Sequence, residues 1–345
     1  MADGDLVFVT GASGFLAKHC VAAALQAGYR VRGSLRGLGR ADEVRAAVAT
    51  VVDPGDRLDF VALDLTSDDG WDEALAGGRY LMHVASPFPL QPPKRRDELV
   101  GPAREGTLRA LKAAARNGVA RTVLTSSTAA IYQGHPRGQP RIFTEADWTV
   151  VDSPTTPGYP LSKTLAERAA WDFMAADASG MELAVINPSL ILGPALDRHI
   201  GSSAEVIALA MGGKYPAVPR IDIALVDVRD VAAMHVAALG HPQAAGERFI
   251  CSTDSLWLME VCRVLHTHFP EFRKRLPKRE LPDFLVRMVA LFDRNLRATT
   301  PDLGVKRPVS NDKARTRLGF EFRPAEEAIV AMGRSLIDLG IVKPT

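Results

Sequence analysis

The sequence predicts an α/β protein with a doubly wound parallel sheet, followed by a smaller and mostly helical C-terminal lobe. In the first half, short apolar runs alternate strictly with helical stretches, which is typical of βαβ units with right-handed crossovers. A glycine-containing turn joins the first apolar run to the first helical stretch, as in open parallel sheets that bind ligands. Beyond about residue 188 the elements become shorter, and proline separates many of them.

The first half supplies the predicted sheet. Residues 6–10 form an apolar run that suits a strand buried on both faces. A helix from Phe15 to Ala27 should follow and end at Gly28, a residue that readily caps a helix C-terminus. The same pattern predicts further strands at 30–35, 59–63, 80–84 and 122–125, with helices at 40–51, 70–76 and 98–117 between them.

The second half begins with a polar loop at 134–158. A helix is predicted at 160–178, with Pro160 in its first turn, where the missing N–H has no cost. A last strand is expected at 183–186, followed by helices at 205–211, 228–239, 257–268, 281–292 and 325–339. We therefore expect a sheet domain over 1–187 and a lobe over 188–345, with about 221–240 returning to the sheet domain.

Composition excludes several classes of function. The 345 residues are 47% hydrophobic and 24% charged, which is ordinary for a globular protein and excludes bulk disorder. The 42 basic and 40 acidic side chains leave a net charge of only +2, so we expect no nucleic-acid partner. No apolar run reaches the ~20 residues of a membrane helix, and residues 1–5 lack the basic start of a secretory signal. Three scattered cysteines predict neither disulfides nor a metal site, and a cytoplasmic location is expected.

The glycine turn predicts a dinucleotide site, in a Rossmann-type domain. Gly11 permits a tight turn, and Gly14 lets a pyrophosphate approach the backbone amides at the start of a helix. Ser13, Phe15 and Leu16 lie in the same stretch. A glycine turn is a weak signal by itself, and a plain strand-to-helix turn is the alternative.

Arginines after the second strand favour NADPH over NADH. A site for NADH usually places Asp or Glu there, but this segment contains Arg36, with Arg40 one helical turn later. A guanidinium can pair with a 2′-phosphate in fork geometry. The alternative is that both arginines are solvated surface charges. Asp64 and Leu65 follow the third strand and should contact adenine, unless Asp64 only caps a loop.

A tyrosine and a lysine four residues apart predict proton-transfer chemistry. On a helix, Tyr159 and Lys163 share one face, and we expect the ammonium to lower the pKa of the phenol toward neutrality. The hydroxyl groups of 125–128, at the end of the fifth strand, could orient a substrate oxygen. In isolation such a Tyr/Lys pair is more often a helix surface pair.

Together these stretches resemble an extended short-chain dehydrogenase/reductase, in the dihydroflavonol-reductase-like branch that includes cinnamoyl-CoA reductases and microbial aldehyde and ketone reductases. The resemblance spans nearly the whole chain. It is carried by 9–16, the end of the second strand, 62–65, 83–87, 124–127, 158–171, 187–194, 226–232 and 309–320.

The resemblance implies a role for each matching residue. Tyr159 would donate the proton, Lys163 would activate it and anchor a ribose, and Ser127 would orient the carbonyl. In the epimerase register Thr128 would take the place of Ser127. The cofactor-binding set would be Gly11, Ser13, Gly14, Phe15, Leu16, Arg36, Arg40, Asp64, Leu65, Val84, Ala85, Ser86, Thr125, Tyr159, Lys163, Pro188, Ser189 and Leu192.

The function expected from this set is NADPH-dependent reduction of an aldehyde or ketone, reversibly the oxidation of an alcohol, by a monomer or homodimer. Phe88 and Ile131 would line the substrate end beside Ser127 and Tyr159, although Phe88 could equally be core. A nucleotide-sugar epimerase or dehydratase is the second hypothesis, and Arg36 in place of an acid argues against it. A non-catalytic NADP sensor is the third, and the presence of the Tyr/Lys pair argues against that.

Overall fold

A computed structural model describes residues 4–86, 95–136 and 141–344. Its main sheet has seven parallel strands in the order β3-β2-β1-β4-β5-β6-β9. These strands are β1 (Leu6–Val9), β2 (Arg30–Leu35), β3 (Leu58–Ala62), β4 (Tyr80–His83), β5 (Arg121–Thr125), β6 (Glu182–Pro188) and β9 (Glu247–Cys251). The predicted fold class is therefore confirmed.

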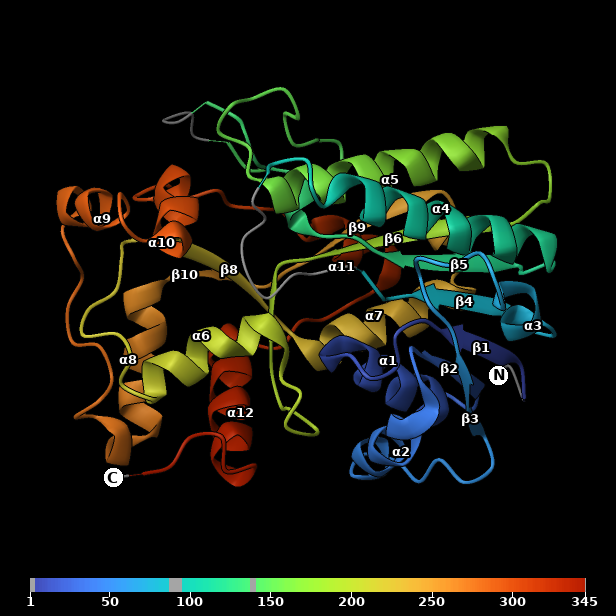
Figure 1. The fold of residues 1–345 in the computed structure, drawn as a ribbon, viewed down its shortest axis with the longest axis horizontal. Helices are drawn as coiled ribbons and strands as arrows, with labels where there is room; N and C mark the ends of the chain where they lie inside the picture. Colours follow the sequence, from blue (N-terminus) through green and yellow to red (C-terminus); the bar gives the residue numbers. More distant parts are fainter. Residues whose placement is uncertain (1–3, 87–94, 137–140, 345) are drawn as a thin grey trace.

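Helices cover both faces of this sheet (Figure 1). One face packs against α1 (Phe15–Gln26), α2 (Ala41–Ala49) and α7 (Val228–Gly240). The other packs against α3 (Trp71–Leu75), α4 (Val100–Arg116) and α5 (Gly158–Ala176). The strand order reverses between β1 and β4, so a crevice is expected at the carboxyl ends of these strands.

The C-terminal lobe holds a small sheet that the sequence did not predict. It consists of β7 (Leu190–Leu192), β8 (Asp222–Asp227) and β10 (Ser255–Trp257), with β8 central. Helices α6 (Gly201–Met211), α8 (Leu258–His268) and α12 (Ala325–Asp338) bury their apolar faces around one core. The smaller helices are α9 (Asp283–Val289), α10 (Arg294–Thr299) and α11 (Asp312–Leu318).

One helix predicted in the second half needs correction. The helix expected at 281–292 is shorter, because Pro282 precedes the first helical residue and the helix ends at Val289. The segment expected to return to the sheet domain is divided. Its first part, 222–227, pairs within the small sheet, and the following helix α7 packs on α1 of the sheet domain. The later strand β9 extends the main sheet beside β6. The division of the chain near residue 187 stays a prediction. None of the described helices has the length and apolar character needed to cross a membrane.

Candidate active site

The glycine turn lies at the reversal of strand order. Gly11 has φ +64°, and a Cβ on it would lie 2.8 Å from the Cβ of Ala85, so glycine is required on both counts. Its amide donates to Ser34 Oγ at 2.9 Å. Gly14 precedes α1, and no side chain caps this helix in the described structure. The first-turn amides of α1 are thus left for another acceptor.

A cavity of about 750 Å³ opens over this turn. The residues predicted for the cofactor that line it come from the turn and the ends of β2, β3 and β4. They are Gly11, Ser13, Gly14, Phe15, Leu16, Arg36, Asp64, Leu65, Val84, Ala85 and Ser86. Asp64 also accepts hydrogen bonds at 2.8 Å from the amide and hydroxyl of Thr66, so it caps its loop as well as lining the cavity. The amide hydrogen bond from Thr66 is the main cause that lowers the pKa of Asp64.

The nearby arginines divide into two groups. Arg36 is exposed and lines the cavity. Arg40 does not line it, because its guanidinium makes a two-point ion pair with Glu43 at 2.9 and 3.0 Å. Arg32 pairs with Asp59, and Arg45 donates to backbone carbonyls. The structure therefore favours Arg36, and not Arg40, as a group available to an anionic ligand.

A second cavity of about 580 Å³ adjoins the first and holds the predicted catalytic residues. Ser86, Ile191, Ser202 and Ser203 line both cavities. Ser127, Tyr159 and Lys163 line the second one, together with Pro188 and Ser189. Tyr159 and Lys163 lie one turn apart on α5, and Ser127 follows β5. The structure thus brings these three predicted side chains together around one cavity.

The direction of the Tyr159 pKa differs from the expectation. Burial raises the pKa of Tyr159 to about 12, and the hydrogen bond with Ser127 opposes this rise. Burial also lowers the pKa of Lys163 to about 8, and its ammonium donates to the Thr125 carbonyl at 3.3 Å. Desolvation disfavours the charged form of each group, which outweighs the expected stabilisation of the phenolate.

Ser127 and Thr128 have different surroundings. The hydroxyls of both lie 3.4 Å from the Pro188 carbonyl, to which they donate. Only Ser127 contributes a hydrogen bond that influences the Tyr159 phenol, whereas Thr128 is 2% exposed and hydrogen bonds with Tyr132. This geometry favours Ser127 as the orienting hydroxyl.

Two predicted positions lie elsewhere. Ile131 is fully buried in a core cluster with Phe143 and Ile250, so it does not line the substrate end. Leu192 is also fully buried, in the core of the C-terminal lobe. Thr125 lines the second cavity, where its carbonyl accepts from Lys163, while its hydroxyl bonds to His235 Nε2 at 2.7 Å. Phe88 lies outside the described residues.

Some cavity residues had no signal in the sequence. Ser202 and Ser203 come from the start of α6, and Asp222 and Asp302 come from the lobe. These four side chains reach the second cavity through the packing of the C-terminal lobe against the main sheet, which a local sequence pattern does not reveal. A hydrophilic pair such as Ser202-Ser203 could have marked a ligand-facing helix start, but serine is common in any loop.

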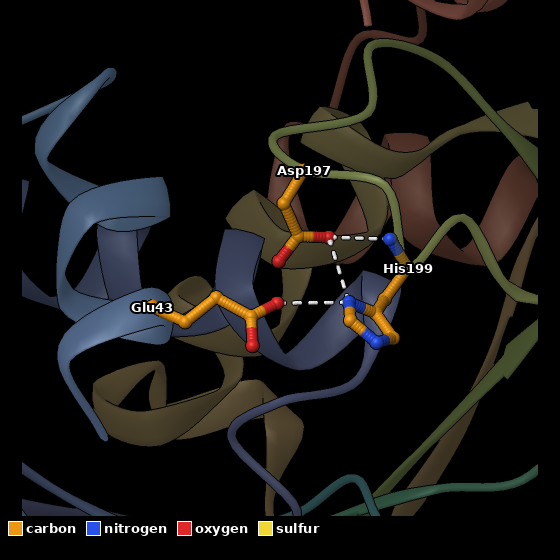
Figure 2. A group of neighbouring side chains, drawn as sticks. All are labelled: Glu43, Asp197 and His199. Atoms are coloured by element: carbon orange, nitrogen blue, oxygen red, sulfur yellow. Dashed lines mark hydrogen bonds and ion pairs between the residues drawn. The ribbon is translucent and has the colours of Figure 1, made fainter. Parts of the chain in front are cut away.

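The structure also brings together Glu43, Asp197 and His199, a group of possible metal ligands shown in Figure 2. His199 Nδ1 lies 2.8 Å from Glu43, and the His199 amide donates to Asp197 at 2.8 Å. The buried ammonium of Lys18 pairs with the same Asp197 oxygen, and Arg40 pairs with Glu43. Lys18 and Arg40 therefore already balance the charges of the two acids. Through these contacts the group links α1 and α2 to the loop before α6.

Comparisons with known proteins agree with this geometry. The profile of the NAD dependent epimerase/dehydratase family matches residues 7–251. The chain is 34% identical to cinnamoyl-CoA reductase 2 of Arabidopsis thaliana, over 79% of this chain and 80% of that protein. It is 32% identical to the ketoreductase azaE of Aspergillus niger, over 92% and 93% of the two chains.

A solved structure shows the same architecture. The yeast methylglyoxal/isovaleraldehyde reductase Gre2, crystallised with NADPH, superposes with a TM-score of 0.81 at 26% identity, covering 98% of this chain and all of Gre2. The resemblance inferred from the motifs is therefore confirmed. The chain belongs to the NAD dependent epimerase/dehydratase family of extended short-chain dehydrogenases/reductases.

Proposed function

We propose that the protein is an NADPH-dependent carbonyl reductase that converts an aldehyde or ketone into an alcohol. The observation that carries this proposal is the position of Ser127, Tyr159 and Lys163 in a cavity that adjoins the glycine-turn cavity. Cinnamoyl-CoA reductase 2, the ketoreductase azaE and Gre2 are all named as reductases, which supports the same class of reaction.

The first cavity fits a phosphorylated dinucleotide. The uncapped amides of α1 and the close approach of Gly11 to Ala85 form a cradle that a Cβ would fill. Arg36 would pair with the 2′-phosphate, and Lys163 would hold the ribose next to the nicotinamide. When bound, NADPH supplies the hydride that is added to the carbonyl carbon.

The side chains of the second cavity would complete the reaction. Because its pKa is raised to about 12, the Tyr159 phenol is protonated at neutral pH and can give its proton to the substrate oxygen. Ser127 would donate a second hydrogen bond to that oxygen and stabilise its developing negative charge. Lys163, with a pKa of about 8, would carry a positive charge near neutral pH and oppose the negative charge left on Tyr159.

Several further properties stay predictions. We propose a small-molecule carbonyl or alcohol substrate, a monomer or homodimer, no nucleic-acid partner and a cytoplasmic location. The cavity walls at Ile191, Ile223 and Ala224 are apolar, which suits an aryl or alkyl group beside the carbonyl.

The proposal is tested by following the absorbance of reduced nicotinamide with a panel of aryl and alkyl aldehydes and ketones. NADH and NADPH are compared in parallel, and sugar nucleotides form a separate arm. We expect turnover of carbonyl compounds with a preference for NADPH. Conversion of sugar nucleotides without carbonyl turnover would instead assign the protein to the epimerases or dehydratases.

A further inference from the structure

A buried acid lies directly behind the proposed catalytic residues. Glu167 follows Lys163 by one turn of α5, and its side chain is 0% exposed. Its carboxylate accepts hydrogen bonds from Ser126 Oγ at 2.5 Å, Asn187 Nδ2 at 2.9 Å and Arg248 Nε at 2.5 Å. A carboxylate without solvent and with three strong donors is held in one orientation.

These contacts hold Ser127 from two sides. Ser126 is the preceding residue, and its hydroxyl is fixed by Glu167. Asn187 uses the same amide nitrogen to contact Glu167 and to donate to the Ser127 carbonyl at 3.2 Å. The Ser126 side chain is therefore tied to Glu167 directly and the Ser127 carbonyl through Asn187, which restrains the backbone that carries the Ser127 hydroxyl.

Arg248 forms a buried ion pair with this carboxylate. It comes from β9, and its side chain is 8% exposed. Its guanidinium lies 3.7 Å from the centre of the Trp148 ring and donates to the carbonyls of Glu145 and Asp147 at 2.8 and 3.0 Å. An arginine anchored at so many points supplies a permanent counter-charge to Glu167.

The charge of Glu167 also acts on Lys163. Burial lowers the pKa of Lys163, and the Glu167 carboxylate is the group that opposes this effect. The other titratable neighbours are Tyr159 on the same helix and His83 at the end of β4. Burial lowers the pKa of His83 to about 3 and raises that of Tyr159, so both are neutral near neutral pH.

We propose that Glu167, held by Arg248, is a positioning residue for carbonyl reduction, which restrains Ser127 through Ser126 and Asn187 and places a carboxylate one turn of α5 from the Lys163 ammonium. This assignment rests on the proposed function. Glu167 lines neither the glycine-turn cavity nor the second cavity, so it is not placed in contact with the cofactor or the substrate.

The test compares Glu167→Gln, Ser126→Ala and the unaltered enzyme across a range of pH. Glu167→Gln removes the charge, so kcat should fall by roughly tenfold or more, and the alkaline limb of kcat/KM should move down by about half a pH unit or more. Ser126→Ala removes one hydrogen bond and keeps the charge, so kcat should fall while the alkaline limb stays in place. The KM for NADPH should change by less than about twofold in both variants.

The matched control is Glu182→Gln. Glu182 lies at the start of β6, away from the site, and its carboxylate pairs with the buried Arg121. This variant should leave both kcat and the pH profile unchanged. If Glu167→Gln does not fold, judged by circular dichroism, the pair is removed together in Glu167→Gln/Arg248→Met and measured against the same expectations.

Each outcome is decisive. If the unaltered enzyme turns over but loss of the Glu167 charge moves neither kcat nor the alkaline limb, this assignment is wrong and the proposed function stands. If kcat falls and the limb stays in place, Glu167 has only a structural role. If the unaltered enzyme reduces no carbonyl compound, the proposed function fails and this assignment fails with it.

Discussion

His235 makes the stability of the protein depend on pH. Its ring is fully buried under the sheet, and Nδ1 lies 2.8 Å from the Val231 carbonyl. Because a carbonyl only accepts, Nδ1 carries the hydrogen, and Nε2 accepts from the Thr125 hydroxyl at 2.7 Å. Burial lowers the pKa of His235 from 6.5 to about 4. We predict that His235→Gln removes part of the acid sensitivity of the fold.

The sign and size follow from proton linkage. The folded pKa is lower than the unfolded one, so the unfolded state binds more protons between these values. Stability is therefore lost as pH falls through this window. Between about pH 7.5 and about pH 5, the two pKa values give a loss of about 2 kcal/mol from this one ring.

The assay is urea unfolding of the unaltered protein and of His235→Gln at both pH values. Near neutral pH the variant should be less stable by about 1–3 kcal/mol, because Thr125 and Val231 lose a partner. At about pH 5 this difference should shrink by about 2 kcal/mol. The matched control is His241→Gln, at a half-buried ring outside the core. An equal effect of His235→Gln at both pH values would refute the reasoning.

Three further predictions concern the site and the packing. In steady-state assays, Ser127→Ala should lower kcat by about 10²–10³, whereas Thr128→Ala should lower kcat by less than about tenfold. Equal effects of the two variants would reject Ser127 as the orienting hydroxyl. Arg36→Ala should raise the KM for NADPH by about tenfold or more and leave the KM for NADH unchanged, as measured by kinetics with both cofactors. Gly333→Ala would place a Cβ 2.5 Å from the Phe269 ring, so urea unfolding should show a loss of about 1–3 kcal/mol, and an unchanged midpoint would contradict this.

The sequence predicted the elements whose pattern is local. The first five strands of the main sheet are short segments that alternate with helices, and the structure places them within one or two residues of the expected bounds. The edge strand β9 was missed, because the short stretch Glu247–Cys251 becomes a strand only through its pairing with β6. The strands of the small sheet are likewise short and depend on partners far away in the chain.

The same distinction applies to the site. The spacing of Tyr159 and Lys163 predicted their common helix face, and the glycine turn predicted the cradle. The direction of the Tyr159 pKa was wrong, because it depends on burial by the folded chain. Glu167 lies within the matching stretch 158–171 but received no role, since an acid on a helix usually faces solvent and its partner Arg248 lies 81 residues away.

The central claim is most directly tested by the kcat of Tyr159→Phe with NADPH and a carbonyl substrate that the unaltered enzyme reduces. This change removes the hydroxyl and keeps the ring in the cavity. We predict that kcat falls by about 10²–10⁴ while NADPH binding, measured by fluorescence titration, is retained. A variant that keeps most of its kcat would show that Tyr159 is not the proton donor and would contradict the account.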